Sequence, residues 1–193
     1  MEIRNYSAIY RIMHWAIAVC MLLLLGTVIM RQTLFSRSHL AGIIQNYVTT
    51  KEIALSRDEI IGISRQISRP VWEWHFYFGY ALAGLFFIRF VLPFFGQMKF
   101  VNPLKKQRTL KEKFQYWSYI VFTACAAVSL ISGLLIKLGP RSLKDPMEEV
   151  HGLSLYYLLA FLIIHLGGVL WAELTNQKGL VSKIVSGTAD QKS

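Results

Sequence analysis

The sequence predicts an all-α integral membrane protein built as a bundle of four membrane-spanning helices. Long stretches without charge support this prediction, because about 20 consecutive apolar residues can cross the hydrocarbon core of a bilayer as a helix. The chain is 54% hydrophobic and only 17% charged, whereas soluble domains average about 25% charged residues. Its 193 residues leave room for a single membrane domain, 1–193, without a second folded domain.

Four apolar stretches define the expected spans and the connections between them. The first connection, 32–71, has about forty residues, which is long for a loop and indicates that it is partly structured. The second connection is basic, and the third is short. The spans are expected at about 12–31, 72–95, 114–137 and 150–172.

The first connection contains the pattern of a short amphipathic helix, from Ser56 to Ser68. Ser56 and Glu59 match a capping box, and isoleucines follow at helical spacing. Pro70 is expected to lie beyond the end of this helix. The helix either lies on the membrane surface or is a solvated helix packed on its neighbours.

The net charge of +10 is distributed as membrane topology requires and does not indicate a nucleic-acid partner. The N-terminal tail, the second connection and the C-terminal tail carry 2, 6 and 3 Lys and Arg residues, and such basic segments stay in the cytoplasm. The first connection, counted together with Arg31 at its start, also carries six, but long segments count for less. Both termini are therefore expected in the cytoplasm, with the loop 32–71 outside.

Four histidines within the predicted spans form the candidate site. His151 and His165 are fourteen residues apart, close to four helical turns, which predicts two rings on one face roughly 21 Å apart. His14 lies at the inner start of the first span and His75 at the outer start of the second. By depth, His14 is expected to pair with His165 and His75 with His151, whereas His39 in the loop has no counterpart.

Two pairs of facing imidazoles are the ligand set of two six-coordinate haem irons, and such sites are built in bundle cores. A lone histidine on an apolar face is more often a hydrogen-bonded core residue, but four that pair by depth are hard to explain in that way. A metal-ion transporter or a proton relay would need acidic or sulfur partners, which the spans almost lack. The chain has no C-x-x-C-H motif, so the two haems b are expected to be noncovalent.

Two glycines and an arginine extend the candidate site. Gly79 follows His75 by one turn and Gly168 is close to His165, where glycine lets a flat macrocycle approach, although small residues are also common where helices pack. Arg89 follows His75 by fourteen residues and is therefore at the depth of the inner pair. We expect Arg89 to bind a haem propionate; extension of its side chain to the membrane surface is the alternative.

The chain resembles the bacterial cytochrome b561 and nickel–iron hydrogenase b-type cytochrome family along all four spans. The resemblance rests on R-I-M-H-W around His14, on H-x3-G-x9-R from His75 to Arg89, and on the interval between His151 and His165. It implies a bacterial inner-membrane protein with two b haems ligated by the pairs named above. Members of the family transfer electrons between a quinone pool and a partner such as a hydrogenase or reductase subunit.

The predicted function is electron transfer across the membrane between a quinone pool and a redox partner protein. Bis-histidine ligation leaves no open position on the iron, which favours electron transfer over oxygen activation. The alternatives are a stand-alone superoxide:quinone oxidoreductase, as in one branch of the family, and a non-redox haem-binding sensor. The tail from W-A-E-L to I-V-S-G resembles the hydrogenase-type subunits, and the long first loop differs from the short-loop members.

Overall fold

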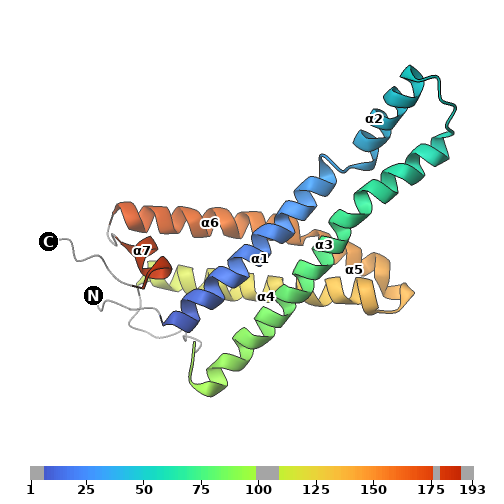
Figure 1. Ribbon diagram of the computed structural model, residues 1–193. Helices are drawn as coiled ribbons and strands as arrows, with labels where there is room; N and C mark the ends of the chain where they lie inside the picture. Colours follow the sequence, from blue (N-terminus) through green and yellow to red (C-terminus); the bar gives the residue numbers. More distant parts are fainter. Residues whose placement is uncertain (1–6, 99–108, 176–178, 188–193) are drawn as a thin grey trace. The chain divides into compact units, whose positions relative to one another are not determined.

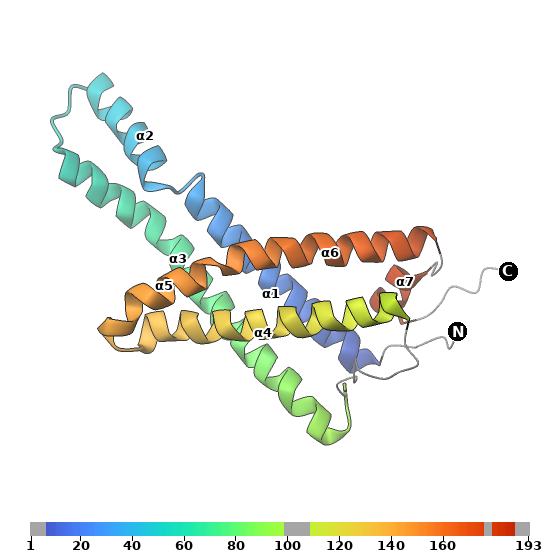
Figure 2. The ribbon, with the colours of Figure 1, turned by 180° about the vertical axis from the view of Figure 1, so that it is seen from behind.

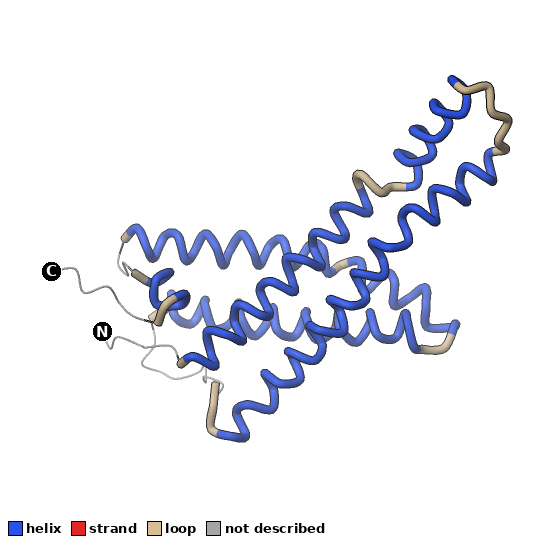
Figure 3. The backbone as a smooth tube through the Cα atoms, in the orientation of Figure 1, coloured by secondary structure: helices blue, strands red, loops and turns tan. Residues whose placement is uncertain are grey.

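The structure is a computed structural model that describes residues 7–98, 109–175 and 179–187. Every regular element in these ranges is a helix, as Figure 3 shows, so the predicted all-α fold class is confirmed. The helices are α1 (Ala8–Gln32), α2 (Arg37–Thr50), α3 (Arg57–Val91), η1 (Leu92–Phe95), α4 (Leu110–Leu138), η2 (Arg141–Leu143), α5 (Lys144–Gly152), α6 (Ser154–Leu174) and α7 (Leu180–Val185).

The helices form two compact units. The first unit combines the start of α1, up to Trp15, with the chain from Phe87 onward, and the second is Ala16–Phe86. The boundary therefore falls inside two continuous helices, α1 and α3. The expectation of a single membrane domain stays a prediction.

Four helical stretches are long and apolar enough to cross a membrane, which agrees with the predicted number of spans. At most 17% of the most apolar window of each stretch is buried within the protein. So much outward-facing apolar surface requires a lipid environment. The stretches are Ala8–Gln32, Arg57–Phe95, Glu112–Leu138 and Arg141–Leu174.

The long helix α4 forms the packing surface of the first unit. Its start is fixed by a capping box in which the Thr109 hydroxyl accepts from the Glu112 backbone N–H. It packs against α5 and α6, which lie beside it in Figure 2. Ser129 and Ser132 are 8% and 2% exposed at this contact, as expected for small residues that let helices approach closely.

The fourth span is interrupted where the sequence predicts a continuous helix. One helix, α5, ends at Gly152 and the next, α6, begins at Ser154, and Figure 2 shows the break between them. The Leu153 N–H bonds to the Val150 carbonyl at 3.3 Å, an i→i−3 bond that tightens the turn. Gly152 stands at the break, and glycine is about 1 kcal/mol less favourable than alanine inside a helix. Helical spacing alone therefore does not define a common face across the break.

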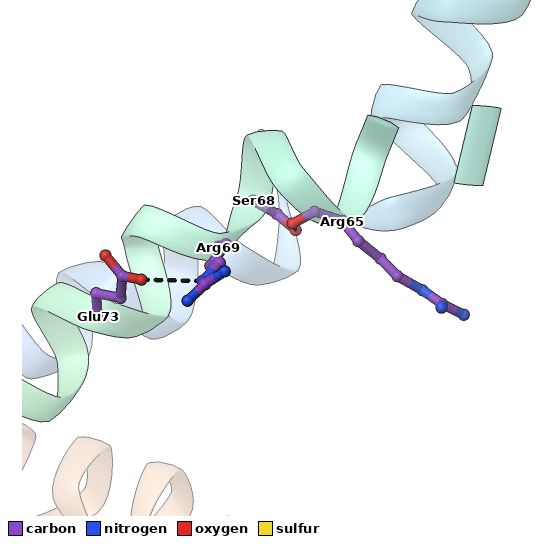
Figure 4. Close-up of polar contacts among 4 residues, drawn as sticks. All are labelled: Arg65, Ser68, Arg69 and Glu73. Carbon is purple, nitrogen blue, oxygen red and sulfur yellow. Dashed lines mark hydrogen bonds and ion pairs between the residues drawn. The ribbon is translucent and has the colours of Figure 1, made fainter. Parts of the chain in front are cut away.

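The sequence-based expectation that a helix ends before Pro70 is wrong, because α3 runs through this proline. Proline removes one backbone hydrogen bond and usually kinks or breaks a helix. Local polar contacts support the turn around it: Arg69 Nε and Glu73 Oε1 form an ion pair at 3.0 Å across the proline, as Figure 4 shows. The Ser68 hydroxyl also donates to the Arg65 carbonyl at 3.2 Å. The predicted short helix is thus the first part of a long one.

The first connection contains a second helix, α2, which the sequence analysis did not predict as an element. Figure 1 shows α2 beside the first part of α3. The predicted capping box at the start of α3 is confirmed, since the Glu59 carboxylate accepts from the Ser56 backbone N–H at 2.7 Å. Val48, Ile60 and Ser64 are 5%, 3% and 0% exposed, so α2 and α3 pack closely within the second unit. The membrane-surface location stays a prediction.

Candidate haem-binding site

The first unit brings His14 of α1 and His165 of α6 together. Their ring centroids lie 6.1 Å apart, with the ring planes inclined at 47°, and both side chains are half-buried. A metal ion bound by one nitrogen of each ring at about 2.0 Å, the usual metal–imidazole distance, separates the two centroids by about 6 Å. The observed spacing therefore fits an iron held between the two rings.

Aromatic side chains surround this pair. Tyr10 stacks on the His14 ring with centroids 6.5 Å apart, and Phe161 stacks on the His165 ring at 5.5 Å. Tyr119 of α4 meets the His165 ring edge-on at 6.1 Å. Among the described residues, no hydrogen bond reaches a ring nitrogen of either histidine. The two imidazoles are thus oriented by apolar packing, which also limits the access of water.

The C-terminal tail fastens the start of α1 within the same unit. The Trp15 indole N–H donates to the Ile184 carbonyl at 3.2 Å, and Arg11 Nη1 donates to the Val185 carbonyl at 3.4 Å. The Glu173 carboxylate accepts backbone N–H groups at the start of α7. No pattern in the sequence indicated this contact. Through it, α7 positions the helix turn that carries His14.

His75 lies in α3, in the second unit, and contacts α1. Its Nδ1 atom is 2.8 Å from the Thr27 hydroxyl oxygen. On the α3 side, Trp72 meets the His75 ring edge-on at 5.2 Å, and the Arg31 guanidinium lies 6.0 Å above the Trp72 ring. The sequence contains no sign of the Thr27 contact, because it depends on how α1 and α3 are rotated about their axes.

His151 lies near the end of α5 and contacts α4. Its Nδ1 atom is 2.9 Å from the Ser129 carbonyl oxygen and 3.3 Å from the Ser132 hydroxyl. The Tyr157 hydroxyl donates to the Ser129 hydroxyl at 2.8 Å. A Cβ at Gly133 would lie 3.0 Å from the His151 ring. These small residues of α4 thus receive a histidine, which the sequence did not indicate.

The structure gives the positions of the remaining candidate residues but does not test their predicted roles as haem ligands or haem contacts. His75 and His151 belong to different units, so their pairing stays a prediction. A Cβ at Gly79 or Gly168 would meet no neighbouring atom within 4 Å, and their predicted contact with a macrocycle also stays a prediction. His39 lies in the first turns of α2, where its backbone N–H donates to the cap of that helix.

Arg89 lies near the end of α3 within the first unit. Its Nη1 atom donates to the Met98 carbonyl at 3.0 Å, so the guanidinium reaches toward the segment that follows the span. Tyr10, whose ring stacks on His14, belongs to the same unit. A propionate contact stays a prediction.

The donor set agrees with a cofactor that needs two protein ligands. No group of three or more His, Cys, Asp or Glu that could hold a bare metal ion occurs within the ranges that the structure describes. A haem brings four ring nitrogens of its own, so a pair of histidines completes its coordination.

The predicted membrane topology stays a prediction. Four basic residues of the second connection on which it depends lie outside the described residues: Lys99, Lys105, Lys106 and Arg108.

These features define a class, that of helical multi-pass membrane proteins, here with two histidine rings held close together in one unit. A family model for prokaryotic cytochrome b561 matches residues 5–187, and the chain belongs to this family. It is therefore a bacterial membrane cytochrome of the b type, a class that binds haem b and transfers electrons. No curated protein matches the chain, and no solved structure does.

Proposed function

We propose that the protein is a di-haem cytochrome b that transfers electrons across the membrane between a quinone pool and a redox partner protein. The observation that carries this proposal is the spacing of His14 and His165, whose ring centroids are 6.1 Å apart. That spacing suits a six-coordinate iron, which exchanges electrons without binding a further ligand. When bound, the haems supply one-electron transfer.

We propose His14 and His165 as the axial ligands of the inner haem, and His75 and His151 as those of the outer haem. The outer pairing rests on their predicted depths in the sequence. A feature common to both rings supports it: each Nδ1 atom lies within hydrogen-bonding distance of an oxygen atom. Metal-bound histidines characteristically donate their second ring N–H to such an acceptor.

Other side chains would orient these ligands and exclude water. Phe161 and Tyr10 stack on the inner histidines, which restricts ring rotation and lowers the local dielectric constant. Gly79 and Gly168 would leave space for the macrocycle beside the helix backbone. Arg89 would carry a positive charge near the inner haem, where it suits a propionate. We also propose that both termini are cytoplasmic, so that the inner haem is near the cytoplasmic surface.

A reduced-minus-oxidised spectrum of the purified protein, with the haem-to-protein ratio, tests the proposal. We expect the α-band of a low-spin b-type haem at a ratio of two haems per chain. Rapid reduction by a quinol should follow, and dithionite should reduce no additional haem. A ratio of one, or a high-spin spectrum with an open iron position, would contradict the proposed pair of bis-histidine sites.

The same preparation separates the proposed function from its alternatives. Absence of reduction by any quinol would favour a haem-binding sensor without redox turnover. Quinone-dependent consumption of superoxide at a high rate, without a partner protein, would favour a stand-alone superoxide oxidase. Reduction by quinol together with slow superoxide turnover is the result expected for a subunit that serves a partner.

A further inference from the structure

The contact between Thr27 and His75 has a definite direction. Thr27 is 8% exposed, and its hydroxyl oxygen is 2.6 Å from the Leu24 carbonyl oxygen and 2.8 Å from His75 Nδ1. All three residues belong to the unit Ala16–Phe86. The hydroxyl thus bridges a backbone carbonyl of α1 and a ring nitrogen of α3.

Counting protons assigns the donor in each of these two bonds. A hydroxyl has one proton, and a carbonyl oxygen can only accept. The Thr27 proton is therefore donated to Leu24, and the Thr27 oxygen accepts the bond from His75. It follows that Nδ1 of His75 carries the proton, and that Nε2 of the neutral ring has the free electron pair that binds a metal.

We propose that Thr27 is a positioning residue that fixes His75 in the tautomer and orientation in which Nε2 ligates the outer haem. This inference rests on the proposed function, because it requires His75 to be a ligand. Donation of the second ring N–H makes an imidazole a more basic ligand. A more basic ligand stabilises the oxidised iron, so Thr27 also lowers the midpoint potential of the outer haem.

His151 illustrates the same principle with a different acceptor. Its Nδ1 atom is 2.9 Å from a backbone carbonyl, that of Ser129, so this bond cannot be removed by a side-chain substitution. The rings of His14 and His165, by contrast, receive no hydrogen bond from the described part of the chain. Hydrogen bonding to the ligands thus distinguishes the two proposed pairs. At His151 the Ser132 hydroxyl lies 3.3 Å from Nδ1 beside the backbone acceptor, whereas at His75 the Thr27 hydroxyl is itself the acceptor, so a Thr27 substitution removes that bond.

Redox titration and electron paramagnetic resonance of Thr27 variants test this inference. Thr27→Val keeps the shape and removes the hydroxyl, whereas Thr27→Ser keeps the hydroxyl. Thr33→Val is the matched control directly after the end of α1, because the Thr33 hydroxyl also donates to a backbone carbonyl, that of Ile29 at 2.7 Å, and Thr33 is exposed. We expect Thr27→Val to raise the lower of the two midpoint potentials and to shift one low-spin ferric signal. Thr27→Ser and Thr33→Val should match the wild type.

Each outcome decides the inference. If Thr27→Val loses one haem and Thr27→Ser retains both, the hydroxyl is needed to present His75, as proposed. If Thr27→Val keeps two haems with wild-type potentials and signals, Thr27 only joins two helices and the inference is overturned. Loss of a haem in Thr27→Ser as well would overturn it too, since packing and not the hydrogen bond would then be the cause. A wild-type protein without two bis-histidine signals would instead refute the proposed function.

Discussion

Gly133 of α4 lies directly against the imidazole of His151. A Cβ at Gly133 would be 3.0 Å from Cε1 and 3.3 Å from Nδ1 of that ring, closer than ordinary van der Waals contact. The ring is also hydrogen-bonded through Nδ1 to the Ser129 carbonyl, so it cannot move away without lengthening that bond. Glycine at this position therefore allows the histidine to lie on the surface of α4.

We expect Gly133→Ala to displace the His151 ring and weaken binding of the outer haem. Overpacking by one methyl group in a well-packed region typically costs about 1–3 kcal/mol. The haem-to-protein ratio should fall from two toward one, and the inner haem should keep its spectrum. Gly42→Ala in α2 is the control, since a Cβ there meets nothing within 4 Å. Full outer-haem occupancy with an unshifted ferric signal in Gly133→Ala would contradict the ligand role of His151.

Alanine substitution of the histidines tests the ligand assignment. His14→Ala or His165→Ala should remove the inner haem, and His75→Ala or His151→Ala the outer one, so that each halves the haem content. His39→Ala should keep both haems, because His39 lies in the α2 segment with no proposed ligand role. Haem content and optical spectra of the five variants provide the measurement. Loss of a haem in His39→Ala, or full occupancy in any of the other four, would show that the pairing is wrong.

The sequence predicted the number of spans and the candidate histidines, because these depend on local composition and depth. It did not predict the hydrogen-bond partners of His75 and His151. The Thr27–His75 bond depends on the rotation of two helices, and hydrophobicity does not encode that rotation at single-residue resolution. Local signals also failed at two places: α3 continues through Pro70, and the helix breaks around Leu153 within an otherwise uniform apolar stretch.

A substitution at Ser64 should open the helical hairpin formed by α2 and the first part of α3. Ser64 is fully buried, and its hydroxyl donates to the Ile60 carbonyl at 2.8 Å. Ser64→Leu places a larger side chain where no space is available, which should lower the free energy of unfolding by about 1–3 kcal/mol. We expect a lower thermal midpoint and faster proteolysis between residues 50 and 57, with unchanged haem content. Ser64→Ala, which adds no volume, should resemble the wild type; equal destabilisation by both would mean that the hydrogen bond matters more than the packing.

We expect the hairpin to contribute to binding of the redox partner and not to binding of haem, and its removal tests this expectation. None of the proposed ligands lies between Arg37 and Ser68, so a variant in which a short flexible linker replaces residues 37–68 should retain both haems. In membranes that contain the native partners, its haems should be reduced more slowly than those of the wild type. Dithionite reduction should be identical in the two, as the control for haem access. Loss of haem from the variant would show that the hairpin is part of the haem-binding fold.

Arg89 should raise the midpoint potential of the inner haem. The guanidinium is held near the end of α3 by the bond from Nη1 to the Met98 carbonyl, in the unit that also contains His14 and His165. A positive charge near a haem favours the reduced state, because the reduced haem carries one positive charge fewer than the oxidised haem and is repelled less. Arg89→Gln should therefore lower the potential of the inner haem and leave that of the outer haem unchanged.

Redox titration of Arg89→Gln measures this effect, and the assignment of the two potentials follows from the histidine variants above. Arg69→Gln is a suitable control, because its side chain is 78% exposed and paired with Glu73, so its removal changes the net charge by the same amount. Salt should reduce any effect of the exposed control much more than that of Arg89, since exposed charges are strongly screened. Unchanged potentials in Arg89→Gln, at full haem content, would leave the alternative in which the guanidinium only extends to the membrane surface.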